Sequence, residues 1–180
     1  MLFRSMVADI RPGALGSNAY GFAAIGSTVF FSANDGNSGQ ELWKTDGTAE
    51  GTTRVADLLP GSQGSNPAYL TVVGSTLFFV ADDGVSGREL WKSDGTATGT
   101  VRVRDAVPGA GSSDPYGLTA VGSTLCYAAL DGANGYELWK SDGTEVGTEV
   151  LKAIAPGRPG SNPDSFTPVG TTDRKSTRLN

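Results

Sequence analysis

An eight-residue phrase recurs three times in this chain at a constant spacing of 48 residues. It reads ELWKTDGT at 41–48, and ELWKSDGT at 89–96 and 137–144. Pro-Gly pairs keep the same spacing without insertion or deletion, and they begin at Pro12, Pro60, Pro108 and Pro156. A fixed period of this size is the signature of a repeat architecture. Each unit is therefore expected to fold and pack in the same way, so the structure predicted for one unit applies to the others.

The middle unit predicts four short β-strands. Apolar and β-branched runs at 69–73, 76–81, 88–93 and 100–105 are separated by turns rich in Gly, Asp and Ser. This is the pattern of successive hairpins, and the Asp-Gly pair at 94–95 is a strong hairpin signal. The unit has no helical periodicity, and its many glycines disfavour a helix of useful length.

The second run of the unit, TLFFVA at 76–81, is apolar on both faces. Leu77 and Phe79 point to one face, whereas Phe78 and Val80 point to the other. A sheet of this kind needs cover on both sides, which face-to-face stacking of four-stranded sheets around an axis provides. The sequence therefore predicts an all-β fold of tandem four-stranded antiparallel blades, of the β-propeller type, as an open or partial ring. A β-solenoid is the alternative.

Each unit has one tryptophan inside the repeated phrase, and these are Trp43, Trp91 and Trp139. We interpret them as large wedges between neighbouring sheets, because apolar residues flank each one and buried aromatic rings contribute several kcal/mol. The Asp-Gly-Thr that follows is turn chemistry, in which Asp accepts backbone hydrogen bonds and Gly takes a positive φ. A tryptophan ladder for sugar stacking is the alternative interpretation.

The phrase ELWKSDGT, together with the Gly-Thr pair that follows it, resembles the ELWxxDGT-repeat proteins of bacteria. The resemblance covers nearly the whole chain, and chance recurrence in register three times is implausible. It implies propeller-like repeats in a secreted or cell-surface protein. It implies no reaction, and no catalytic residue is carried over from it.

We expect a single repeat array over residues 7–172. Its repeats run at about 7–54, 55–102 and 103–150, with a partial repeat at 151–172. A propeller needs about four to eight blades, so three complete units cannot close a ring. We therefore expect either a longer parent protein or copies of the chain that self-associate.

Both ends of the chain depart from the repeat. We expect a lone fourth-type strand at 7–10 and a lone first-type strand at 165–169. Residues 173–180, DRKSTRLN, are basic in an acidic chain and read like an in-frame translation of a common sequencing adapter, which predicts a non-native tail. The opening MLFRSM lacks the apolar segment of about 7–15 residues that a signal peptide requires.

Composition disfavours several classes of function. With 14 Lys and Arg against 19 Asp and Glu, the net charge of −5 disfavours nucleic-acid binding. No apolar run approaches the roughly 18 residues of a membrane span. The chain has no histidine, which removes the commonest general base and any Ser-His-Asp arrangement. The single Cys126 aligns with Phe30 and Phe78, so we predict that it is a core residue. Because the sequence shows no catalytic constellation, we also predict no enzyme activity.

Calcium is the one cofactor that the pattern raises. Each unit has an Asp-Gly turn with a glutamate six residues after the Asp, and the pairs are Asp35 and Glu41, Asp83 and Glu89, and Asp131 and Glu137. Calcium takes six to eight oxygen ligands, of which each loop supplies only a few. The alternative is a turn-forming Asp, with a Glu that bonds backbone groups at the start of the third strand.

The leading functional hypothesis is a non-catalytic repeat scaffold that binds a protein or glycan partner through its loops. The variable positions lie in loops, at 37–40, 85–88 and 133–136, which read NSGQ, VSGR and ANGY. One alternative is a fragment of a propeller hydrolase or lyase whose catalytic residues lie in other blades. Another is a calcium-stabilised structural array.

Overall fold

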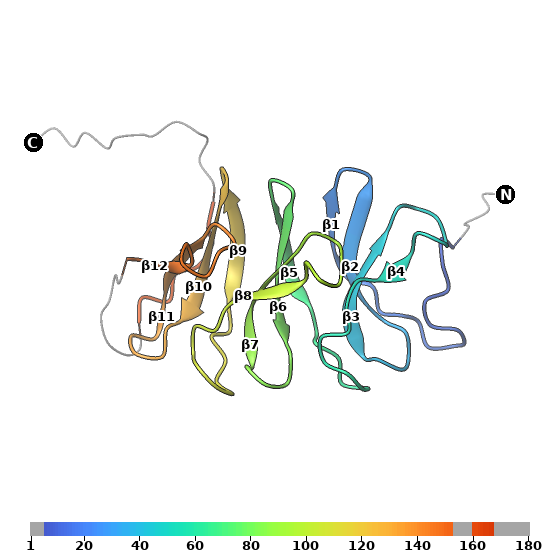
Figure 1. The fold of residues 1–180 in the computed structure, drawn as a ribbon, viewed down its shortest axis with the longest axis horizontal. Helices are drawn as coiled ribbons and strands as arrows, with labels where there is room; N and C mark the ends of the chain where they lie inside the picture. The colour runs from blue at the N-terminus through green and yellow to red at the C-terminus, as the bar shows by residue number, and fades with distance from the viewer. Residues whose placement is uncertain (1–5, 153–159, 168–180) are drawn as a thin grey trace, which may run out of the picture.

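The structure, a computed structural model, describes residues 6–152 and 160–167. Within these residues it contains β-strands and no helix, and the strands are β1 (Tyr20–Ile25), β2 (Thr28–Asn34), β3 (Gln40–Thr45), β4 (Thr53–Arg54), β5 (Ala68–Val73), β6 (Thr76–Asp82), β7 (Arg88–Ser93), β8 (Val101–Arg104), β9 (Tyr116–Val121), β10 (Thr124–Leu130), β11 (Tyr136–Ser141) and β12 (Glu149–Lys152). They form three antiparallel sheets that stand side by side (Figure 1).

Each sheet corresponds to one sequence unit. The strand order follows the chain in all three: β1-β2-β3-β4, β5-β6-β7-β8 and β9-β10-β11-β12. We call these sheets blade 1, blade 2 and blade 3. The second and third strands of each blade share the longest unbroken register; in blade 2 it runs from the Leu77–Ser93 pair to the Asp82–Arg88 pair.

The turn between the third and fourth strands is a closed hydrogen-bonded loop. In blade 2, Asp94 Oδ1 accepts bonds from the backbone N of Thr96 at 2.8 Å and from its hydroxyl at 2.7 Å. Thr96 Oγ1 accepts a bond from the Gly99 N at 2.9 Å, and the Ser93 and Thr100 hydroxyls meet at 2.7 Å. The same bonds recur in the other two blades. The repeated Asp-Gly-Thr therefore closes each corner.

The hydrophobic core lies between the blades. One buried cluster joins blade 1 to blade 2 and consists of Phe30, Leu42, Val55, Leu77, Phe79, Ala81 and Trp91. A second cluster joins blade 2 to blade 3 and consists of Val73, Phe78, Leu90, Val103, Leu125, Tyr127, Ala129 and Trp139. Blade 2 is thus covered on both faces, because its second strand carries large apolar side chains in alternating directions.

The first strands of neighbouring blades lie beside one another. β1 contacts β5, and β5 contacts β9. Between the last two, Thr71 Oγ1 donates a hydrogen bond to the backbone oxygen of Leu118 at 3.3 Å. This arrangement places the first strand of each blade innermost and the fourth strand outermost, as in a propeller.

The prediction of an all-β fold with tandem propeller-type blades is confirmed, and the sheets do not close into a ring. Strands hydrogen-bond within their own unit, so a β-solenoid, in which strands of successive coils pair, is not the fold. Among the described residues, no helix is long and apolar enough to cross a membrane.

The expected lone strands at the two ends are not formed in the described residues. Residues 7–10 are irregular, since no described third-type strand lies beside them to pair with. Residues 165–167 form no strand, and 168 and 169 lie outside the described part of the chain. The tail at 173–180 also lies outside it.

Candidate functional site at the turn-bearing rim

One edge of the blade array carries three β-turns and the entrances to the innermost strands. The β2–β3, β6–β7 and β10–β11 turns lie along the lower edge of Figure 1. The end of the second strand in each blade is bonded to the segment that leads into the first strand. In blade 2, for example, the Asp82 N donates to the Ser65 O at 3.0 Å. We call this edge the turn-bearing rim.

The predicted Asp residues form the turns at this rim. Asp83 Oδ1 accepts hydrogen bonds from the backbone N of Val85 at 2.9 Å and of Ser86 at 2.7 Å. Burial opposes the charged form, but the bonds from Ser86 and Val85 and the nearby Arg102 outweigh it and lower the pKa of Asp83. Asp35 and Asp131 hold the corresponding turns in the same way, and their pKa values are lowered too.

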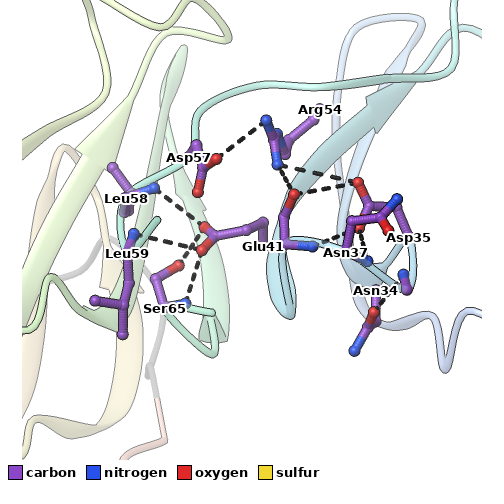
Figure 2. A network of polar contacts seen from close by, with 11 residues as sticks. Asn34, Asp35, Asn37, Glu41, Arg54, Asp57, Leu58, Leu59 and Ser65 are labelled. Atoms are coloured by element: carbon purple, nitrogen blue, oxygen red, sulfur yellow. Dashed lines mark hydrogen bonds and ion pairs between the residues drawn. The ribbon is translucent and has the colours of Figure 1, made fainter. Parts of the chain in front are cut away.

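The predicted Glu residues are buried and point to the connection that enters the next blade. Glu41 Oε2 accepts from the Ser65 hydroxyl at 2.5 Å, and Glu41 Oε1 accepts from the Ser65 backbone N at 2.8 Å (Figure 2). The Leu58 backbone N donates to the same carboxylate at 3.3 Å. Glu89 bonds Ser113 equivalently, and the Ser161 hydroxyl donates to Glu137 at 2.6 Å.

Desolvation dominates the electrostatics of these buried carboxylates. Burial raises the pKa of Glu89 to about 7, and the hydrogen bonds from Ser113 and Ala106 only partly offset it. Burial also raises the pKa of Glu41 above its ordinary value. The alternative interpretation of the sequence placed these glutamates against backbone groups at the start of the third strand. In the structure they bond backbone groups of the connection to the next blade instead.

The Asp and Glu of each predicted calcium pair point to different partners. Figure 2 shows Asp35 directed to its own turn and Glu41 directed to Leu58, Leu59 and Ser65 on the other side. Within residues 6–152 and 160–167, no three Asp, Glu, His or Cys side chains gather closely enough to hold a metal ion. The structure therefore brings the residues of each pair onto one hairpin without bringing their carboxylates together.

The tryptophans lie away from the rim surface, on the faces of the blades. Trp91 is buried between blades 1 and 2, and Trp139 is buried between blades 2 and 3. The Trp139 indole N donates to the Ala129 O at 3.0 Å, and Arg104 lies 5.9 Å from the centre of its ring. Trp43 is half-buried on the face of blade 1 that no described blade covers.

Aromatic and charged side chains at the rim differ between the blades. The first residue of the third strand is Gln40, Arg88 or Tyr136. The Tyr136 ring meets Tyr116 edge-to-face, with 5.4 Å between the ring centres. Arg88 Nε lies 3.6 Å from Asp114 Oδ1. The rim therefore presents aromatic and ionic groups on a backbone that is the same in each blade.

Tyr69 is the most unusual residue near this rim. It lies at a bulge in β5 and has a φ of 56°, and its side chain is 54% exposed. The equivalent residues in the other two blades are Gly21 and Gly117, at φ 70° and 65°. A positive φ is rare for a bulky residue and costs roughly 1–2 kcal/mol. Two glycines at the same repeat position were the sequence signal for this conformation.

An open cleft lies at the blade 1 end of the rim. Its volume is about 370 Å³, and its lining includes Arg11, Leu15, Asp35 and Asn37. The chain has no histidine, and the half-buried Cys126 lies on β10, where burial raises the pKa of its thiol. The rim thus presents aromatic, amide and ionic groups.

Sequence reasoning missed the serines that receive the buried glutamates. Ser65, Ser113 and Ser161 recur every 48 residues, each 24 residues after its glutamate, and this constant offset was the available signal. It also missed the lysine contact between blades. Lys44 Nζ donates to the Gly95 O of the next blade at 2.8 Å, so the repeated lysine is a link between neighbouring units.

No family model and no curated protein matches this chain. Among solved structures, it is similar to a prolyl endopeptidase from a study of inter-domain dynamics in catalysis and specificity. The sequence identity is 16% and the TM-score is 0.51, over 77% of this chain and 20% of the endopeptidase chain. That enzyme contains a propeller, so the likeness concerns the fold. This chain corresponds to about a fifth of its length.

Proposed function

We propose that this chain is a non-catalytic β-propeller-type scaffold whose turn-bearing rim binds a protein or glycan partner. The buried framework is the same in every blade: Glu41, Glu89 and Glu137 are almost fully buried. The rim side chains on this framework differ from blade to blade. Following the resemblance of the repeated phrase to the ELWxxDGT-repeat proteins, we place the parent protein in that family, secreted or at a bacterial cell surface.

The conformation of Tyr69 is the observation that carries this proposal. Its ring is mostly exposed, so it gains little from packing, while its backbone conformation costs free energy that glycine would not. Residues held in such conformations cluster at ligand-binding and active sites. A strained, exposed aromatic side chain on an innermost strand is therefore best explained by contact with a partner.

The chemistry of the rim suits the two partner classes. Tyr and Arg are enriched at the centres of protein interfaces, and the rim carries Tyr69, Tyr136 and Arg88. A tyrosine also combines a flat apolar face with a polar hydroxyl, which suits the face and the hydroxyl groups of a sugar ring. Mixed aromatic and ionic groups do not resemble the clustered Lys and Arg of a nucleic-acid site.

Binding to a glycan array and to an array of cell-surface proteins tests this proposal. The purified chain would be compared with two rim variants, Tyr69→Gly and Tyr136→Ser. Val146→Ser is the matched control, because Val146 is 90% exposed in the loop between β11 and β12, away from the rim. We expect the wild type and the control to bind the same targets, with binding reduced at least tenfold in Tyr69→Gly.

Two results would contradict the proposal. The first is that the Tyr69→Gly and Tyr136→Ser variants both bind as the wild type does. The second is that the folded wild type binds to neither array. Circular dichroism of each variant separates lost binding from lost folding.

A second candidate is that this chain is part of a propeller that accompanies a hydrolase or lyase domain. The similarity to a prolyl endopeptidase favours it. Since the chain has no histidine, the reaction would depend on residues elsewhere in the parent protein. We expect no cleavage of a proline-containing chromogenic peptide by this chain alone, and cleavage would overturn the non-catalytic assignment.

A further inference from the structure

The two interfaces between blades use the same repeat positions on each side. The face of blade 2 that packs on blade 1 carries Leu70, Leu77, Phe79, Ala81 and Trp91. The opposite face of blade 2 carries Val73, Phe78, Leu90 and Val103 and packs on blade 3. We call the first kind of face the tryptophan face and the second kind the phenylalanine face. In each interface, a phenylalanine face meets a tryptophan face.

No described blade packs on the tryptophan face of blade 1, where Phe22 is exposed but Phe31 and Ala33 are buried. The equivalents of the residues that pack in blade 2 are all apolar, namely Phe22, Val29, Phe31, Ala33 and Trp43. Phe22 stacks on Phe31 at 5.6 Å between ring centres and is 65% exposed, whereas its equivalent Leu70 is packed against the core. A hollow of about 230 Å³ with mainly apolar lining lies on this face, between Val7, Phe22 and Phe31.

Blade 3 leaves the complementary phenylalanine face open. Its residues at the equivalent positions are Val121, Cys126, Leu138 and Leu151. Leu151 is 49% exposed and Val121 is 45% exposed, whereas the equivalent Val55 and Val73 are buried in the two internal clusters. One molecule therefore carries both halves of an interface that it already forms twice.

We propose that the tryptophan face of blade 1, on which no described blade packs, binds the open phenylalanine face of blade 3 in a second copy of this chain, head to tail. Such a contact continues an interface that exists twice within the molecule, so it needs no new kind of packing. Closed propellers have about four to eight blades, and a pair of copies with three described blades each falls within that range. The geometry points to a twofold ring of six blades.

Polar groups on blade 1 and blade 3 also fit the proposed head-to-tail contact. Inside the molecule, Lys44 reaches the Gly95 O of the next blade. Lys140 is the equivalent lysine of blade 3, and it pairs with Glu149 of its own blade at 3.0 Å. Gly47 is the equivalent glycine of blade 1, and open space surrounds it. In the pair of copies, Lys140 of one copy would bond the Gly47 O of the other.

Residues 7–10 partly cover the proposed binding face. Val7 and Ile10 stand at the repeat positions of Val55 and Leu58, which pack on the tryptophan face of blade 2. They line the hollow on blade 1 without forming a strand. Strand β12 of the second copy would take the same place, so we expect this segment to compete with the second copy for the face.

Sedimentation velocity over a wide range of protein concentration tests the proposal. We expect a monomer–dimer equilibrium for the wild type. Phe22→Asp and Leu151→Asp each place a charge at one end in an exposed position that a monomer tolerates, and each should weaken dimerisation at least tenfold. Val146→Asp, also exposed but on neither face, is the matched control and should dimerise as the wild type does.

Mixing the two charged variants identifies the orientation. A head-to-tail contact leaves one intact interface between Phe22→Asp and Leu151→Asp, so the mixture should form a heterodimer that neither variant forms alone. Deleting residues 1–10 should strengthen dimerisation by removing the competing cover. Cys126→Phe should also strengthen it, because Phe30 and Phe78 pack on Gly95 and Gly143 of the following blade, where cysteine is too short to reach.

Four results would overturn the inference. These are a wild type that stays monomeric at all concentrations, self-association that neither charged variant weakens, no heterodimer on mixing, and weaker association after deletion of residues 1–10. Circular dichroism and a thermal melt of each variant show whether the blades are still folded, so a loss of folding is not mistaken for a loss of the interface.

Discussion

The Ser113 hydroxyl donates a hydrogen bond of 2.5 Å to Glu89 Oε2 and so ties the third strand of blade 2 to the connection that enters blade 3. The backbone N groups of Ser113 and Ala106 donate to the same carboxylate. Both side chains are almost completely buried. The carboxylate is therefore a fixed acceptor inside the protein, and its charge affects the stability of the contact between blades.

The titration of Glu89 predicts that stability falls as the pH rises through the neutral range. Burial raises its pKa to about 7 from 4.5, so between these values the folded chain holds a proton that the unfolded chain has released. The stability that Glu89 contributes is fully present below pH 4.5 and is lost as the pH rises through about 7. At ~1.4 kcal/mol per pKa unit, we expect a loss of roughly 2–3 kcal/mol in urea denaturation between pH 5 and pH 8.

Glu89→Gln is the control for this titration. Its unfolding free energy should change less between pH 5 and pH 8 than that of the wild type, because glutamine does not titrate. Equal slopes would contradict the assignment. The turn residue Asp83 titrates in a separate window: its pKa is lowered below 3.8, so the stability it contributes is lost only as the pH falls through that lowered value.

Gly99→Ala should destabilise the chain by roughly 2–3 kcal/mol, although the φ of Gly99 is not positive. A Cβ at this position would lie 2.1 Å from Asp94 Oδ1, so the corner loop would have to open. Gly16→Ala is the matched control, because Gly16 also lacks a positive φ and has open space around it. In chemical denaturation the control should be neutral or slightly stabilising. Equal effects of the two substitutions would contradict the closed-corner geometry.

Tyr69→Gly should stabilise the chain by roughly 1 kcal/mol, since glycine adopts a φ of 56° without the strain that tyrosine bears. The same substitution should weaken partner binding if the ring contacts the partner. Thermal melting and array binding of one preparation measure the two effects together. A destabilised Tyr69→Gly would show that the ring is a packing residue and would count against its role at the rim.

The repeat predicted most of the fold because the residues that form the strands, the turns and the two apolar faces recur at the same positions in each unit. The strands expected in the middle unit at 76–81 and 88–93 lie at Thr76–Asp82 and Arg88–Ser93. Residues 7–10 are different: their side chains repeat the pattern of a fourth strand, but strand formation needs a hydrogen-bonding neighbour, which a one-dimensional pattern does not contain.

The candidate site could be predicted only in part. The turns at 37–40, 85–88 and 133–136 were expected to carry the variation, because Asp-Gly turns mark exposed hairpin ends. The partner of each buried glutamate was not expected, since Glu89 and Ser113 lie 24 residues apart and meet only after the blade has folded. The strain at Tyr69 was also not expected, because tyrosine normally favours an extended strand.

The tryptophan substitutions test most directly whether stability depends on blades packed face to face. Trp91 and Trp139 are buried between blades, whereas Trp43 is half-buried on a face that no described blade covers. Urea denaturation at low protein concentration should show losses of roughly 3–5 kcal/mol for Trp91→Ala and Trp139→Ala, and about 1–2 kcal/mol for Trp43→Ala. Equal losses at the three positions, or little loss at Trp91 and Trp139, would contradict stacked blades.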